Sequence, residues 1–149
     1  MSEARRVLLV ANQTALMTPL REAVERRARQ GPARFHLVVP ATPKGLHRPV
    51  DPETAGREQA QAQLEAALPL LSKAAGGEVT GAVGDADPLA AIQDVVVSRA
   101  VDEIIVSTLP RRLSRWLKLD LPSKARGLGL PLTHVEADVA EAHEAVSAP

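Results

Sequence analysis

Residues 6–11 read Arg6-Val7-Leu8-Leu9-Val10-Ala11, and every residue after the arginine is apolar. An unbroken apolar run of this length is typical of a strand buried on both faces, as in the centre of a parallel sheet. Four further segments have strand character, at residues 34–39, 78–83, 103–107 and 131–135. Longer segments of helical period separate these runs, and this alternation predicts an α/β domain.

Prolines and capping residues mark where the intervening helices begin. Thr18-Pro19, Asp51-Pro52 and Asp87-Pro88 each place a favoured N-cap residue before a proline suited to the first helical turn. We therefore expect one domain over residues 1–136, an open five-stranded parallel sheet in the order 3-2-1-4-5 with helices on both faces. Residues 137–149 contain acids but no Lys or Arg, and they predict an acidic C-terminal tail.

Composition excludes several classes of protein. The chain of 149 residues has no cysteine, which excludes a disulfide framework and a thiol nucleophile. Its 18 basic and 18 acidic residues give no net charge, so neither nucleic acid nor an anionic membrane is an expected partner. It contains no apolar stretch long enough to span a bilayer, and its first residues lack the layout of a signal peptide. A cytoplasmic location follows as an expectation.

Motifs for common chemistries are also missing. The four histidines, His36, His47, His134 and His143, show no metal-ligand spacing, so we expect no metal site. No serine lies in a Gly-x-Ser-x-Gly elbow, and no Gly-x-x-x-x-Gly-Lys phosphate loop occurs. The sequence therefore offers no catalytic residue.

A ligand site is nevertheless predictable from topology, because open parallel sheets bind ligands beyond the carboxyl ends of their strands, where the winding reverses. The residues expected there are Asn12, Gln13, Thr14, Pro40, Ala41, Gly84, Asp85, Ser107 and Thr108. The alternative is that Asn12 and Thr14 only stabilise a turn and Asp87 only caps a helix. The loop from Pro40 to Pro52 is long, and such loops are often functional or mobile, so a lid over the site stays an open possibility.

The segment from Pro110 to Gly129 is strongly basic, with six basic residues against the single acid Asp120. Arg111, Arg112 and Arg115 lie close together along the chain and form a candidate anion clamp, with Trp116 able to stack on a ring. In the alternative interpretation Leu113, Trp116, Leu117 and Leu119 pack inward and the arginines are solvated.

Several segments resemble the universal stress protein family. They are Gly84-Asp85-x-Asp87-Pro88, Asp102-Glu103-Ile104-Ile105-Val106-Ser107, Leu113-Ser114-Arg115 and Leu130-Pro131-Leu132-Thr133-His134-Val135. Together with the order and length of the elements, the resemblance covers nearly the whole chain. It implies a nucleotide-binding type of α/β fold with five parallel strands, and a homodimer.

The nucleotide-binding motif of that family is not matched. Nucleotide-binding members place an Asp after the first strand, where this chain has Asn12. Their phosphate loop reads Gly, two residues, Gly, nine residues, Gly, then Ser or Thr, and that spacing falls on Ser107, Pro110, Asp120 and Leu121. Pro110 removes an N–H donor, and Asp120 would repel a phosphate by up to ~4 kcal/mol at about 4 Å. The resemblance together with this missing motif therefore implies a divergent member of the family, one that does not bind ATP as the nucleotide-binding members do.

We expect a cytoplasmic homodimer of stress-response or regulatory type, without catalytic activity and without a cofactor. The resemblance implies the dimer, and the exposed edge of the fifth strand, Leu130 to Val135, is its expected interface. The alternative is a protein that binds a small molecule, ATP or another adenine nucleotide, or that is a slow ATPase, and in which Arg111, Arg112 and Arg115 replace the glycine loop. A phosphate-ester enzyme is a third possibility, for which the sequence supplies no base.

Overall fold

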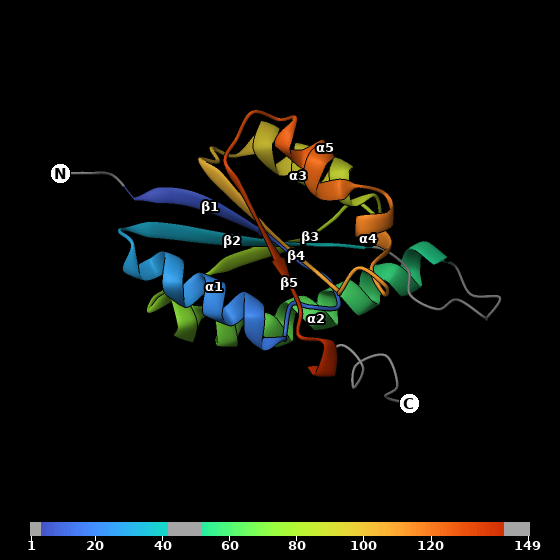
Figure 1. Ribbon diagram of the computed structural model, residues 1–149, viewed down its shortest axis with the longest axis horizontal. Coiled ribbons are helices and arrows are strands. Elements are labelled where there is room, and N and C mark those ends of the chain that lie inside the picture. The colour runs from blue at the N-terminus through green and yellow to red at the C-terminus, as the bar shows by residue number, and fades with distance from the viewer. Residues whose placement is uncertain (1–3, 42–51, 142–149) are drawn as a thin grey trace.

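Five strands form one parallel sheet in the computed structural model, which describes residues 4–41 and 52–141 (Figure 1). The strands are β1 (Arg5–Val10), β2 (Ala33–Pro40), β3 (Thr80–Gly84), β4 (Glu103–Thr108) and β5 (Leu132–Glu136). Their order is β3-β2-β1-β4-β5, and each neighbouring pair is parallel. The predicted α/β class and strand order are confirmed.

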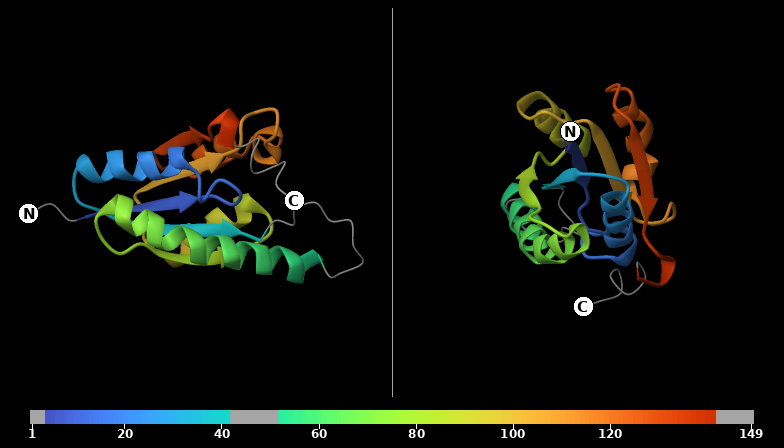
Figure 2. Two further views of the ribbon diagram at one scale, coloured as in Figure 1. Left: turned by 90° about the horizontal axis from the view of Figure 1, so that it is seen from below. Right: turned by 90° about the vertical axis from the view of Figure 1, so that its left-hand side faces the viewer.

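Helices cover both faces of the sheet, as predicted (Figure 2). On one face lie α1 (Thr18–Arg29) and α2 (Pro52–Ala75), and on the other lie α3 (Pro88–Ser98) and α5 (Leu121–Arg126). The short helix α4 (Arg115–Lys118) follows β4. No helix within residues 4–41 and 52–141 is both long enough and apolar enough to cross a membrane.

The apolar run of β1 explains why it lies in the middle. Successive side chains of a strand point to opposite faces of a sheet. Val7 and Leu9 accordingly pack into the core beneath α1 and α2, whereas Leu8 and Val10 pack into the core beneath α3 and α5. All four side chains are at most 1% exposed. A polar residue at any of these positions would be buried, so the run has to be continuously apolar.

The start of α1 differs from the sequence expectation. Met17, rather than Thr18, occupies the N-cap position, and its side chain makes no capping hydrogen bond. The backbone N–H and the hydroxyl of Thr18 instead donate to a carboxylate oxygen of Glu141, at 3.2 and 3.1 Å. An acidic residue of the C-terminal segment thus compensates the positive end of the helix.

The first residues of the acidic segment pack against the domain. Ala137 is buried and belongs to a small cluster with Met17 and Leu109. Residues 142–149 of the expected tail, and residues 42–51 of the loop expected from Pro40 to Pro52, lie outside the described residues. Asp51, the expected cap of α2, also lies outside them, whereas Asp87 caps α3 as predicted, accepting a 3.2 Å hydrogen bond from the backbone N–H of Leu89.

Candidate functional site

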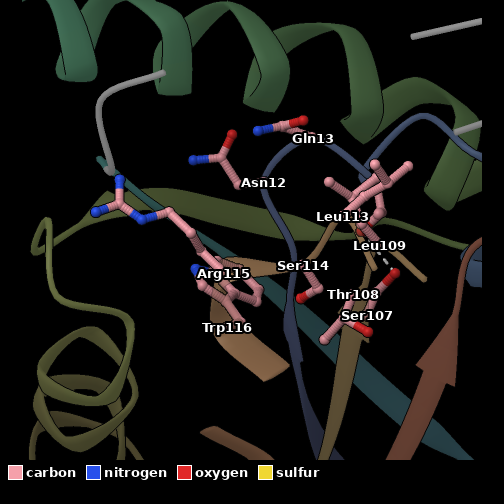
Figure 3. A pocket seen from close by; sticks show the side chains of 10 residues that line it. Asn12, Gln13, Ser107, Thr108, Leu109, Leu113, Ser114, Arg115 and Trp116 are labelled. Atoms are coloured by element: carbon pink, nitrogen blue, oxygen red, sulfur yellow. Dashed lines mark hydrogen bonds between the residues drawn. The ribbon is translucent and has the colours of Figure 1, made fainter. Parts of the chain in front are cut away.

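A cavity of about 110 Å³ lies beyond the carboxyl ends of β1 and β4. These are the strands at which the winding reverses, since β2 flanks β1 on one side and β5 flanks β4 on the other. The lining residues are Asn12, Gln13, Thr14, Ser107, Thr108, Leu109, Leu113, Ser114, Arg115 and Trp116 (Figure 3). The structure therefore gathers the predicted residues after the first and fourth strands around one cavity.

Buried hydroxyl groups join the two strand ends. Thr14 and Ser107 are 2% and 1% exposed, and their hydroxyl oxygens lie 2.7 Å apart, within hydrogen-bonding distance. The side-chain amide of Asn12 donates to the carbonyl of Pro40 at 2.6 Å. The carbonyl oxygens of Asn12 and Thr14 also accept turn hydrogen bonds. Asn12 and Thr14 thus have the turn-stabilising role that the sequence left open beside the ligand-binding role.

The segment after β4 closes one side of the cavity. The carbonyl of Pro110 accepts hydrogen bonds from the backbone N–H groups of Leu113 and Ser114, at 2.8 and 3.0 Å. The hydroxyl of Ser114 then caps α4 by accepting from the N–H of Leu117 at 3.1 Å. This turn directs Trp116 inward, where it is 8% exposed and belongs to the core beneath α3 and α5.

The expected arginine clamp is divided by the structure. Arg115 lines the cavity, whereas Arg111 and Arg112 are exposed and do not line it. In Figure 3 the guanidinium group of Arg115 extends away from the hydroxyl groups of Ser107 and Ser114. Among the apolar residues expected to pack inward, Trp116 does so, but Leu119 is 56% exposed.

The predicted residues after the second and third strands border a different hollow. Ala41, Gly84 and Asp85 line a space of about 680 Å³ at the β3 edge, together with residues of α2 and α3. The backbone N–H of Ala41 donates to the carbonyls of Gly84 and Asp85, at 3.1 and 3.3 Å. Pro40 reaches the 110 Å³ cavity only through its carbonyl contact with Asn12.

Gly84 has a packing role. A Cβ atom at this position would lie 2.7 Å from Cγ2 of Val38 and 2.9 Å from Cβ of Ala91. Both distances are shorter than van der Waals contact, so the absence of a side chain allows α3 to approach the sheet closely.

Asp120 lies at the N-cap of α5, is exposed and does not line the 110 Å³ cavity. It is the one non-glycine residue with positive φ among residues 4–41 and 52–141, with φ 59° and ψ 40°. Aspartate tolerates this left-handed conformation better than most residues, although glycine adopts it most readily. The position aligned with the third glycine of the family loop thus has a backbone conformation that favours glycine.

The cavity is polar but almost uncharged. Among the described residues, 4–41 and 52–141, Arg115 is the one charged residue in its lining, and neither a carboxylate nor a histidine lines it. Within the described part of the chain, no cluster of three histidine or acidic residues is placed to hold a metal ion.

His134 lies beside the cavity rather than in it, with Nε2 2.8 Å from the hydroxyl oxygen of Thr108. Burial lowers the pKa of His134 below its ordinary value of 6.5, the carboxylate of Glu136 opposes that effect, and Arg126 adds to it.

Sequence reasoning did not place Leu109, Leu113 and Ser114 in the site. The sequence contains only a weak signal for these residues. The spacing of apolar residues between Leu109 and Trp116 indicates that some side chains turn inward, but it does not indicate which cavity they line.

These features define a doubly wound α/β protein with a small polar cavity at its switch point. No protein-family model matches the sequence, and no curated protein matches it significantly. Among solved structures, a universal stress protein in complex with cAMP matches with a TM-score of 0.62 and 13% sequence identity, covering 92% of this chain and 100% of that one. A universal stress protein from Archaeoglobus fulgidus matches with a TM-score of 0.59 and 17% identity, covering 88% of this chain and 93% of that one.

The chain therefore has the universal stress protein fold, as the sequence resemblance implied. At these identities the likeness extends to the fold and not to the ligand.

Proposed function

We propose that this chain is a cytoplasmic, homodimeric protein of stress-response or regulatory type, without catalytic activity, that does not bind ATP in the manner of nucleotide-binding universal stress proteins. The observation that carries the proposal is the size of the switch-point cavity, about 110 Å³. Sites for drug-sized ligands generally enclose ~300–1,000 Å³. An adenosine triphosphate needs a site in that range.

The chemistry of the lining supports the same conclusion. A phosphate loop needs free backbone N–H donors, and Pro110 has none. The hydroxyls of Thr14 and Ser107 are bonded to each other, and the hydroxyl of Ser114 accepts the capping hydrogen bond of α4. Hydrolysis would further require a general base, and in the part of the chain that the structure describes no carboxylate or histidine lines the cavity.

Trp116 provides a direct test, because it is the only tryptophan of the chain and lines the cavity. We expect ATP with magnesium to cause no saturable change in its emission, and calorimetry to show no binding tighter than millimolar. Freshly purified protein should also show no excess absorbance at 260 nm. Saturable quenching at micromolar ATP, abolished by Arg115→Ala but not by Arg111→Ala, would refute the proposal.

The dimer is supported by the position of β5 at an edge of the sheet. An edge strand presents unpaired backbone groups that native proteins pair or protect. The carbonyl of Pro131 accepts from the N–H of Ile104, and the N–H of Ala137 donates to the carbonyl of Thr108. The backbone groups of the odd-numbered residues in this segment therefore point toward β4. The backbone groups of alternate residues, such as Leu132 and His134, then face outward, and we assign the dimer interface to the segment from Leu130 to Val135.

A second candidate function is the binding of a small polar ligand at the same cavity. Arg115 at its rim favours this function, and so does the similar universal stress protein that was solved in complex with cAMP. This function requires the cavity to widen on binding. Titration of the Trp116 emission with cAMP tests this function. A saturable change whose affinity falls at least tenfold in Arg115→Ala, but not in the control Arg112→Ala, would establish binding. An unchanged signal would exclude cAMP as the ligand.

A further inference from the structure

A second polar hollow lies at the opposite end of the sheet from the switch-point cavity. It measures about 490 Å³ and is formed where β1, β2 and β3 begin and where the chain leaves α3. Figure 1 shows these strand ends on the far side of the molecule from α4. The polar lining residues are Arg6, Glu78, Arg34, His36, Thr80 and Arg99.

The sheet register places two of the arginines directly beside each other. Arg6 of β1 pairs with Arg34 of β2, and one step inward on the same face Leu8 pairs with His36. Neighbouring strands are about 4.8 Å apart, so the two guanidinium groups start from adjacent backbone positions. The same face is covered farther along by α3, which ends at Ser98, and Arg99 follows immediately. Arg6, Arg34 and Arg99 therefore line the same hollow, at the point where the helix stops covering the sheet.

Arg99 is in contact with His36. Its Nη1 lies 3.2 Å from Nδ1 and 3.4 Å from Nε2 of the imidazole, and Nδ1 is also 2.7 Å from the hydroxyl of Thr80. A guanidinium group therefore lies against a side chain that is itself able to become cationic.

Acidic neighbours offset these positive charges only in part. Within residues 4–41 and 52–141, no carboxylate forms an ion pair with Arg6, Arg34 or Arg99. The carboxylate of Asp102 accepts a hydrogen bond from the backbone N–H of Arg6 at 2.8 Å, but it does not pair with the guanidinium group. Among the described residues, Glu78 is the one acid in the lining, which also contains three arginines. Because the chain as a whole has no net charge, the excess of positive charge is a property of this hollow and not of the protein in general.

We propose that this hollow is a binding site for a small oxyanion of the phosphate class, held by Arg6, Arg34 and Arg99. The planar guanidinium group donates paired hydrogen bonds that match a phosphate in geometry. The volume of about 490 Å³ admits a phosphate with a small organic group attached. A small anion fits better than a nucleic acid backbone, because the three arginines line one hollow of limited volume.

His36 reports on occupancy of the site. Burial lowers the pKa of His36 below its ordinary value of 6.5, and the neighbouring Arg99 lowers it further. The charged groups that line the hollow with it are Arg6, Arg34, Arg99 and Glu78, and Thr80 supplies a hydroxyl. A bound anion would counteract Arg99 and raise the pKa of His36.

The experiment is an NMR titration of the imidazole signals, with His36 assigned by its loss in His36→Gln. Inorganic phosphate and phenyl phosphate are added separately near pH 6.5 at constant ionic strength, with chloride as the control. We expect a saturable shift of His36 with both phosphates, and tighter binding of phenyl phosphate if the natural ligand is an ester. Arg34→Gln and Arg99→Gln should weaken binding at least fivefold, whereas Arg29→Gln on the exposed part of α1 should not change it.

Three results would overturn the proposal. One is a His36 response to phosphate that equals the response to chloride. Another is unchanged binding in both Arg34→Gln and Arg99→Gln, each of which should fold because the altered side chain is exposed. The third is an oligonucleotide that binds more tightly than phenyl phosphate and displaces it, which would make the surface a nucleic-acid contact.

Discussion

Thr14 and Ser107 are separated by 93 residues, yet their buried hydroxyl oxygens lie 2.7 Å apart. This contact joins the loop after β1 to the end of β4 and forms part of the wall of the switch-point cavity. A donor or acceptor buried without a partner is costly, so each hydroxyl depends on the other.

Replacing Ser107 by Ala should destabilise the fold by about 1–3 kcal/mol, because Thr14 loses its partner in a buried place. The double variant Thr14→Val with Ser107→Ala should cost clearly less than the sum of the single changes. Urea unfolding of the four proteins measures this coupling. Strictly additive effects would show that the two hydroxyls do not depend on each other.

Asp120 has a left-handed backbone conformation. Asp120→Gly should be neutral or stabilising by up to about 1 kcal/mol, whereas Asp120→Val should destabilise by about 1–2 kcal/mol. Thermal unfolding reports the difference, since 1 kcal/mol moves the Tm of a chain of this size by roughly 2–4 °C. Equal Tm values for the Gly and Val variants would contradict the assigned backbone conformation.

Gly84→Ala should destabilise the domain by about 1–3 kcal/mol, because the new methyl group would clash with Val38 and Ala91. Gly77→Ala is the matched control, since nothing lies within 4 Å of a Cβ atom at that position. Denaturant midpoints of the two variants test whether Gly84 is required for the packing of α3. A Gly84→Ala variant as stable as Gly77→Ala would rule out that role.

Stability should fall as the solution is acidified through the histidine range. Because the folded pKa of His134 lies below the ordinary 6.5, the unfolded chain takes up a proton first, and the stabilising contribution is lost as pH falls from about 7 toward the folded pKa. His36 acts in the same direction. In His134→Gln, which keeps a donor near Thr108, the loss of stability between about pH 7 and 5 should be smaller. Identical pH profiles would dismiss His134 as a contributor.

Thr133 is exposed on the edge strand β5, and a lysine there should block pairing with a second copy. We expect the wild-type protein to sediment as a dimer and Thr133→Lys as a folded monomer. Ala82→Lys changes an exposed residue on the opposite edge strand, β3, and should remain dimeric. A monomeric wild-type protein, or dissociation caused only by the change at Ala82, would exclude the assigned interface.

The interior of the fold was more predictable from sequence than its edges. Residues 6–11 indicate β1 clearly because burial on both faces allows only apolar side chains, and the structure ends that strand within one residue of the expectation. The third strand was expected at residues 78–83, but it runs from Thr80 to Gly84 because half-exposed edge positions impose weaker constraints. The cap of α1 was missed, since Glu141 reaches Thr18 from the other end of the chain.

The candidate site was predictable only as far as topology determines it. Strand order alone places Asn12, Thr14 and Ser107 together. The positions of Arg111, Arg112 and Arg115 depend on the turn after Pro110, which occurs together with the inward packing of Trp116 and cannot be deduced from spacing. The volume of the cavity is likewise a property of packed side chains in three dimensions.

The central position of β1 has a consequence for synthesis of the protein. One edge of β1 pairs with β2, which follows soon in the chain, but the other pairs with residues 103–106. A ribosome therefore releases β1, β2 and β3 well before the strand that covers the second edge of β1. Until β4 emerges, the edge of β1 that will later pair with β4 stays open, and its apolar side chains are uncovered. A nascent-chain chaperone would bind at this edge, and premature self-association would begin there.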